Sequence, residues 1–324
     1  MPTRSESKDR KRVALAGVGT VGGGVYERLA ARPQSFEVVG IVCRDPSRHA
    51  GKSAPAELLT TDAASFGDYD ILVETIGGVT TARDIVLAAL ERGAHVVTAN
   101  KALLANFFAE IDAAAKRGGG RVIYSAAVGG GVPMLETVDD IAARTEIKRL
   151  EAVVNGTTNL ILDRLGAGAS LEAAIREAQD AGFAEADPSA DIDGADAAQK
   201  LSLLARRAFG VDIDPNTIPT DKLASLAPEK VVAAVKAGSP YKQVALAERT
   251  PAGVTAEVRL RQVPADSPLA KPRLEENCLV ITCADGTETV LHGKGAGRDP
   301  TADSVFSDIE TLIRSDASEP VAAI

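Results

Sequence analysis

An acidic segment followed by an aspartate and lysine pair is the part of the sequence best suited to chemistry on a small charged ligand. Four carboxylates lie between residues 185 and 193, and Asp196 and Lys200 follow at a spacing of four. On a helix, that spacing places both side chains on one face. A surface ion pair is the ordinary interpretation of such a spacing, but it does not explain the acidic segment. Crowded carboxylates repel one another unless they are paired, and the ammonium group of an amino-acid ligand would supply a partner.

A glycine-rich string near the N-terminus has the spacing of a dinucleotide-binding turn. Residues 17–22 read Gly-Val-Gly-Thr-Val-Gly, directly after the apolar run 12–16 and before a helical pattern from about residue 23 to 31. In this context, glycines permit a tight turn and let the backbone approach a pyrophosphate at the N-terminus of the helix. A plain glycine turn is the simpler interpretation, but the strand and helix around the string favour a cofactor site.

The residues after the second predicted strand indicate which dinucleotide binds. An acidic residue there holds a ribose hydroxyl, whereas a basic residue suits the 2′-phosphate of NADP. Arg44 comes first and Asp45 follows it, with Arg48 and Lys52 nearby. The basic cluster favours NADP, and Asp45 keeps NAD open as the alternative.

Short apolar runs alternate with helical patterns in the N-terminal part of the chain. The runs predict strands at residues 12–16, 37–42, 70–74, 95–98 and 121–124, with helices at about 23–31, 84–92 and 107–116. This alternation predicts the α/β class, with a Rossmann-type, doubly wound parallel sheet.

The pattern changes after Gly129-Gly130-Gly131, where Pro133 suits the first residue of a helix. Ser170 suits the N-cap of a helix that ends near Gly182, and another helical pattern covers residues 195–209.

Strands then follow at 254–260, 278–283 and 287–291, the last two joined by an Asp285-Gly286 turn, and they predict an antiparallel sheet with one wet face. We expect a dinucleotide-binding domain over residues 1–132 and a second, α+β domain over residues 133–300. The last segment, residues 301–324, is expected to be a helix that packs back on the first domain.

Composition excludes several classes of partner. The net charge of -9 opposes nonspecific binding to nucleic acid or to an anionic membrane surface. No apolar run approaches the ~18 to 20 residues of a membrane helix, and residues 1–11 lack the apolar core of a signal peptide. Cys43, Cys278 and Cys283 lack metal-type spacing and suit buried thiols in a reducing compartment. We expect a cytoplasmic protein with neither a nucleic-acid nor a membrane partner.

Several strings together resemble the homoserine dehydrogenase family over most of the chain. They are Asn155-Gly156-Thr157-Thr158-Asn159, the run from Gly182 to Pro188 with the residues up to Lys200, Thr98-Ala99-Asn100-Lys101, and the glycine turn from Val128 to Pro133. The family interconverts L-aspartate 4-semialdehyde and L-homoserine with NADPH or NADH, on the route to threonine and methionine. The resemblance implies this activity, and it implies a homodimer formed through the second domain, which also binds the substrate.

The resemblance also implies roles for individual residues. Lys200 is expected to act as the acid/base with Lys101 as its companion, since an ammonium group can stabilise the oxyanion that hydride delivery creates. Substrate binding is expected at Glu185, Asp196 and Asp191. The cofactor is expected at Gly17, Gly19, Thr20, Val21, Gly22, Arg44, Lys101, Gly182 and Gly297.

In the family, a sodium ion is held by a glutamate and by backbone carbonyls of the glycine turn. Here Ser125 stands where the glutamate is usual, while Val128, Gly130 and Val132 keep the carbonyl positions. Backbone carbonyls do not depend on the side chain, but loss of the charged ligand should weaken a site for a monovalent ion. We therefore expect a sodium site with a reduced sodium requirement.

Two other interpretations fit part of the sequence. Another Rossmann dehydrogenase of a small amino or hydroxy acid would use the glycine string but leave residues 155–159 and the acidic segment unexplained. A noncatalytic dinucleotide-binding regulator would be expected to have lost catalytic positions, whereas both lysines are present. Because only residues 298–324 follow Gly297, we expect no appended regulatory domain.

Overall fold

A computed structural model describes residues 10–317 of the chain. The chain divides into two compact units. Unit 1 comprises the chain up to Ala127 together with the residues from Arg298 onward, and unit 2 comprises Val128–Gly297. Each unit has its own sheet.

Unit 1 is built on a six-stranded sheet in the order β3-β2-β1-β4-β5-β6, with every neighbouring pair parallel. Its central strands are almost entirely buried, because helices follow strands throughout and cover the sheet. The predicted Rossmann-type fold is confirmed, although the last strand is two residues long instead of four. The strands are β1 (Lys11–Ala16), β2 (Phe36–Val42), β3 (Leu59–Thr60), β4 (Ile71–Glu74), β5 (His95–Thr98) and β6 (Val122–Ile123).

The helices of unit 1 are α1 (Thr20–Ala30), α2 (Thr80–Glu91), α3 (Lys101–Gly118) and α10 (Arg298–Ala317). The first three were predicted, but each begins three to six residues earlier than expected. In α3 the reason is local, because the side chain of Asn100 accepts a hydrogen bond from the Leu103 amide (3.0 Å) and caps the helix. The predicted start at Phe107 is instead a kink inside the helix.

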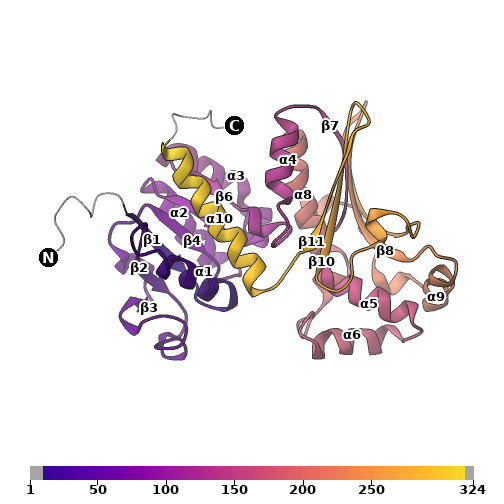
Figure 1. Cartoon of the computed structure of the whole chain (residues 1–324), viewed down its shortest axis with the longest axis horizontal. Helices are drawn as coiled ribbons and strands as arrows, with labels where there is room; N and C mark the ends of the chain where they lie inside the picture. The colour runs from indigo at the N-terminus through magenta and orange to yellow at the C-terminus, as the bar shows by residue number, and fades with distance from the viewer. Residues whose placement is uncertain (1–9, 318–324) are drawn as a thin grey trace. The chain divides into compact units, whose positions relative to one another are not determined.

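Helix α10 packs along α1 within unit 1 (Figure 1). Val305 and Ile309 are fully buried in the same apolar cluster as Val25. The two helices approach closely at Gly24, where an added Cβ would lie 2.9 Å from that of Ala302. Helix α10 thus completes the core of unit 1, although the whole of unit 2 separates it in sequence from the other helices of that unit.

Unit 2 contains a five-stranded antiparallel sheet in the order β11-β10-β7-β8-β9. The predicted antiparallel sheet is confirmed in β9, β10 and β11, but the two strands at its centre were not recognised. One of them buries Lys242 and Gln243, so its sequence does not read as an apolar run. The strands are β7 (Ile147–Val153), β8 (Tyr241–Thr250), β9 (Gly253–Gln262), β10 (Glu276–Cys283) and β11 (Glu288–Lys294).

The helices of unit 2 are α4 (Met134–Ala142), α5 (Gly156–Gly166), α6 (Leu171–Asp180), α7 (Ser189–Ile192), α8 (Ala195–Phe209) and α9 (Pro228–Lys236). Helix α8 has the predicted bounds, and Ser170 caps α6 as predicted by accepting a hydrogen bond from the Ala173 amide (3.2 Å). Pro133 is the N-cap of α4 and not its first residue.

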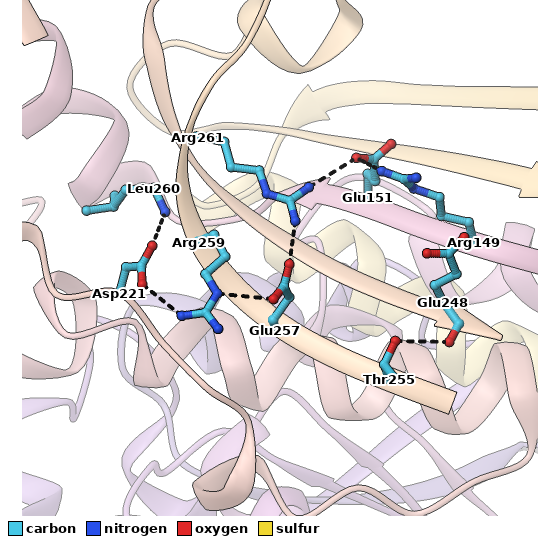
Figure 2. Close-up of polar contacts among 9 residues, drawn as sticks. All are labelled: Arg149, Glu151, Asp221, Glu248, Thr255, Glu257, Arg259, Leu260 and Arg261. Carbon is cyan, nitrogen blue, oxygen red and sulfur yellow. Dashed lines mark hydrogen bonds and ion pairs between the residues drawn. The ribbon is translucent and has the colours of Figure 1, made fainter. Parts of the chain in front are cut away.

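The two faces of the unit 2 sheet differ in polarity. On one face Ala152, Ala245 and Val258 are paired across neighbouring strands and fully buried. The other face carries a chain of alternating charges across β7 and β9, which we call the charged ladder (Figure 2). Its members are Arg149, Glu151, Glu257, Arg259 and Arg261, with Asp221 at the end beyond β9. The face of the sheet that was predicted to be exposed to solvent therefore carries ion pairs.

Strand β8 buries one charged side chain completely. The Lys242 ammonium donates a hydrogen bond to the carbonyl of Pro272 (2.6 Å) and lies 3.8 Å from the carboxylate of Asp163. The pKa of Lys242 is lowered to about 8, mainly by burial; Asp163 acts against this shift, and Arg273 contributes to it. Unit 2 thus holds a lysine whose charge costs free energy in the folded state.

Candidate functional site

The glycine turn of unit 1 joins β1 to α1 and requires its glycines. Gly17 has φ +102°, a conformation that other residues rarely adopt, and a Cβ on Gly22 would lie 2.2 Å from the Gly17 carbonyl oxygen. By contrast, no atom lies within 4 Å of a Cβ placed on Gly19, the N-cap of α1. The first amides of a helix have no partner within the helix and attract anions. The turn therefore has the close packing and the open side that a pyrophosphate needs.

The end of β2 separates the two residues that bear on cofactor choice. The carboxylate of Asp45 accepts hydrogen bonds from the Ser47 hydroxyl (2.6 Å) and amide (3.1 Å) and pairs with Arg48. The bond from the Ser47 hydroxyl is the main reason why the pKa of Asp45 is lowered. Arg44 is exposed, and its side chain makes no hydrogen bond or ion pair to residues 10–317. The basic side chain is thus available to a ligand, whereas the acidic one is already engaged.

A buried polar network lies at the carboxyl ends of β4 and β5. Glu74 is fully buried and accepts hydrogen bonds from the Thr98 hydroxyl (2.5 Å) and from the side chain of Asn100 (3.4 Å). Asn100 in turn caps α3, whose first residue is Lys101. The network thus fixes the backbone from which the predicted catalytic lysine of unit 1 projects.

In unit 2 the predicted pair Asp196 and Lys200 lies on α8, and the two side chains are in contact. The Lys200 ammonium is 2.8 Å from the Asp196 carboxylate and donates a hydrogen bond to the Val154 carbonyl (2.6 Å). Their side chains are only 15% and 9% exposed. This is a largely buried pair with a fixed geometry, unlike the surface pair that such a spacing usually forms.

Asn155 connects this pair to the acidic segment. Its side-chain amide donates hydrogen bonds to Asp191 (2.6 Å) and Asp196 (2.8 Å), while its side-chain oxygen accepts one from the Thr158 amide and caps α5. Burial raises the pKa of Asp191, and the nearby Asp196 acts in the same direction. Asn155 therefore holds two carboxylates close together beside the Lys200 ammonium.

The other carboxylates of the acidic segment have separate environments. Asp187 accepts a hydrogen bond from the Ser189 amide (3.0 Å), and Asp193 pairs with Lys222 (2.9 Å). The expectation that this charge needs an external partner was therefore wrong for these two residues. Glu185 is exposed, and its carboxylate has no partner within residues 10–317. The structure does not bring it into contact with Asp191 or Asp196.

The second glycine turn, Val128–Val132, belongs to unit 2. Gly130 packs against Gly295, since an added Cβ would lie 2.3 Å from its carbonyl oxygen. Of the three carbonyls expected to bind sodium, that of Val132 already accepts a hydrogen bond from the Met134 amide (2.7 Å). Ser125 lies in unit 1 and its amide donates a hydrogen bond to Asp308.

Sequence reasoning missed two residues of these networks. Asn155 was part of an unusual string but received no role, although an Asn between a strand and a helix is a signal for an N-cap. Glu74 was included in a predicted strand, and its position as the polar end of an apolar run was the available signal.

The predicted residues divide between the units. Unit 1 holds Gly17, Gly19, Thr20, Val21, Gly22, Arg44 and Lys101, and unit 2 holds Gly182, Glu185, Asp191, Asp196, Lys200 and Gly297. Within the described range, no group of three or more His, Cys, Asp or Glu side chains could hold a metal ion. The three cysteines are buried and free, as predicted. No helix in the part of the chain that the structure describes is long and apolar enough to cross a membrane.

Comparison with known proteins agrees with the motif resemblance. The family model for the homoserine dehydrogenase NAD binding domain matches residues 17–125, and the model for homoserine dehydrogenase matches residues 133–309. A homoserine dehydrogenase of Pseudomonas aeruginosa is 36% identical over 319 residues, which are 95% of this chain and 74% of the relative. One of Bacillus subtilis is 33% identical over 316 residues, or 94% of this chain and 73% of the relative.

Solved structures give the same result. A homoserine dehydrogenase from Thiobacillus denitrificans superimposes with a TM-score of 0.89 at 33% identity, covering 97% of this chain and 76% of that one. A hyperthermophilic archaeal homoserine dehydrogenase in complex with NADPH has a TM-score of 0.78 at 25% identity, with coverage of 96% and 99%. From the two family models and the relatives at more than 30% identity, we conclude that this chain belongs to the homoserine dehydrogenase family.

Proposed function

We propose that Lys200 is the acid/base and Lys101 its companion in the reaction of this enzyme. The enzyme is an NAD(P)-dependent oxidoreductase that interconverts L-aspartate 4-semialdehyde and L-homoserine, in the biosynthesis of threonine and methionine. Family membership therefore favours this activity over another Rossmann dehydrogenase or a noncatalytic regulator. The bound nicotinamide cofactor supplies or accepts the hydride.

The observation that carries the proposal is the fixed position of the Lys200 ammonium between the Val154 carbonyl and Asp196. Two acceptors leave one of its three N–H donors for a substrate oxygen. When the aldehyde is reduced, negative charge builds on that oxygen, and the lysine stabilises it and donates the proton. Asp196 and Val154 orient the ammonium, so little reorganisation is needed during the reaction.

The substrate's own ammonium group is proposed to bind at Asp191 and Asp196, with Glu185 as a further ligand. Asp191 and Asp196 both accept hydrogen bonds from the Asn155 side chain, and the Lys200 ammonium pairs with Asp196. Two neighbouring carboxylates attract a cationic group, which explains why such a cluster would select an amino-acid substrate.

The test is turnover of aspartate semialdehyde by Lys200→Ala, followed through the absorbance of NADPH and of NADH. The expected result is a loss of turnover with cofactor affinity largely unchanged, because Lys200 is not among the residues expected to bind the cofactor. Lys222→Ala is the matched control, since this lysine also pairs with an aspartate of the acidic segment but is 64% exposed. Normal turnover by Lys200→Ala would remove the lysine from its role, and no turnover by the unaltered chain would refute the activity.

NADP is the proposed cofactor, with NAD as the alternative. Arg44 is exposed without a partner in the described range, while Asp45 is engaged by Ser47 and Arg48. Arg44→Ala should weaken NADPH binding about tenfold or more and leave NADH binding nearly unchanged, since a charged hydrogen bond contributes ~1.5 to 3 kcal/mol. Calorimetric titration with both cofactors measures this, and an equal loss for both would contradict it.

Sodium binding is proposed at the carbonyls of Val128, Gly130 and Val132. The fit is partial, because Ser125 brings no charge and the Val132 carbonyl already accepts a hydrogen bond. The enzyme should therefore retain most of its activity in sodium-free buffer. Steep activation with a tight sodium affinity would refute this.

A homodimer that pairs the charged ladders of two copies is proposed as the assembled form. The ladder is self-neutralising, because its three arginines alternate with three carboxylates, those of Glu151, Glu257 and Asp221 (Figure 2). A twofold axis places such a face against itself. Glu151→Arg places a third positive side chain beside Arg149 and Arg261, and it should give a monomer by light scattering. Glu229→Lys on α9 is the control and should leave the dimer intact. A monomeric unaltered chain would overturn the proposal.

The remaining predictions concern organisation and location. We propose that residues 1–132 form the cofactor domain and that residues 133–300 form the substrate-binding and dimerisation domain, with the last helix packed on the cofactor domain. Limited proteolysis tests this assignment. A cytoplasmic location is likewise a prediction, which cell fractionation checks.

A further inference from the structure

Glu74 occupies a special place in the parallel sheet of unit 1. It is the last residue of β4, and its neighbours in register are Ala16, the last residue of β1, and Thr98, the last residue of β5. In open parallel sheets, ligands bind outside the carboxyl ends of the strands at the point where the strand order reverses. That point lies between β1 and β4, so Glu74 is adjacent to it.

All groups that bond to the Glu74 carboxylate are donors. One oxygen accepts from the Ile76 amide (3.0 Å) and the Asn100 side chain (3.4 Å), and the other accepts from the Thr98 hydroxyl (2.5 Å). The Thr98 oxygen itself accepts a bond from the Asn100 amide (3.0 Å), so its hydrogen is free to point at Glu74. Burial raises the pKa of Glu74, and these hydrogen bonds act against the rise. The arrangement suits an ionised carboxylate.

The donors around Glu74 are all neutral. The Ile76 and Gly77 amides, the Thr98 hydroxyl and the Asn100 amide supply hydrogen bonds but no positive charge. The side chain is fully buried, so water does not screen it directly. Its negative charge therefore acts on whatever lies just outside the ends of the strands.

We propose that Glu74 is an electrostatic determinant of the cofactor site, which favours the oxidised nicotinamide over the reduced one. The oxidised ring carries a positive charge and the reduced ring is neutral, while the rest of the cofactor is the same in both. A buried negative charge at this end of the sheet therefore distinguishes the two forms. The inference rests on the nicotinamide cofactor of the family and not on the proposed roles of the lysines.

The experiment compares the dissociation constants of NADP⁺ and NADPH by calorimetry, without substrate, for the full chain and two neutral variants. Glu74→Gln keeps the shape of the side chain, and Glu74→Met is a second variant without charge. The ratio of the NADPH constant to the NADP⁺ constant should fall by about tenfold in both, the size expected for one charge acting across roughly 10 Å of protein at an effective dielectric of ~20. Circular dichroism checks that each variant is folded.

Two further variants separate charge from structure. Thr98→Val removes a hydrogen bond from the same network but keeps the Glu74 carboxylate. The affinities for NADP⁺ and NADPH can therefore both fall, while the ratio of the two dissociation constants stays as in the unaltered chain. Asp70→Asn removes an exposed carboxylate from the opposite end of β4 and should leave the ratio unchanged. If the neutral variants of Glu74 weaken both forms equally, or change neither, the proposal is wrong and the residue is only structural.

Discussion

Replacing the buried Lys242 should change how the stability of the protein depends on pH. The pKa of this lysine is about 8 in the folded chain, compared with 10.5 as its ordinary value, mainly because of burial. The unfolded chain therefore binds more protons than the folded one between these values, so stability rises with pH. The free-energy cost of burying the charged Lys242 is fully present below pH 8 and is lost as pH rises through 10.5.

The two pKa values set the size of the effect. Linkage gives a cost of roughly 3 to 4 kcal/mol at pH 7, which falls to roughly 1 to 2 kcal/mol at pH 9.5. Lys242→Met keeps an unbranched side chain and removes the titrating group, while Asp163 retains its neighbour Arg273 at 3.6 Å. Between pH 7 and pH 9.5, the unaltered chain should therefore gain about 2 kcal/mol relative to the variant.

Urea denaturation at the two pH values, followed by circular dichroism, measures this difference, and comparison of the two proteins cancels every other titrating group. Lys236→Met is the matched control, because that lysine lies exposed on α9 and should give no pH-dependent difference. Parallel stability curves for the unaltered chain and Lys242→Met would refute the reasoning.

The glycine turn, the Asn155 cap and the buried Cys278 can each be tested by experiment. Gly22→Ala should abolish cofactor binding in a fluorescence titration, since its Cβ would lie 2.2 Å from a backbone oxygen; unchanged affinity would contradict the turn geometry. Asn155→Ala should lower the free energy of unfolding by about 2 to 4 kcal/mol in urea, because a helix cap and the shared donor of two carboxylates are lost. Cys278 should resist iodoacetamide at pH 8 until the protein unfolds, as mass spectrometry would show, because burial raises its pKa to about 11.

The sequence was most informative where local chemistry and fold agree. The alternation of apolar runs and helical patterns predicted unit 1, and α8 was placed at its observed bounds. Helix starts were less accurate because caps such as Asn100 lie outside the apolar pattern. Strand β8 was missed because buried polar residues such as Lys242 obscure the pattern, and their burial depends on contacts made by distant segments.

The candidate site was predicted as a set of residues but not as a set of contacts. The spacing of Asp196 and Lys200 indicated one helix face, and the two side chains do meet. Sequence could not show that Asp193 is paired with Lys222, because the partner lies far along the chain. Nor could it show Asn155 between two carboxylates, since that geometry requires α5, α7 and α8 to be in place.

The return of α10 to unit 1 has a consequence for synthesis on the ribosome. The core of unit 1 includes Val305, Ile309 and Leu312, so it cannot close until α10 has been made, after the whole of unit 2. Unit 2 is continuous in sequence and is complete earlier. The apolar face of α1 therefore lacks its partner helix while unit 2 is being synthesised. Truncation within α10 should leave that face exposed, so that the chain binds chaperones or aggregates.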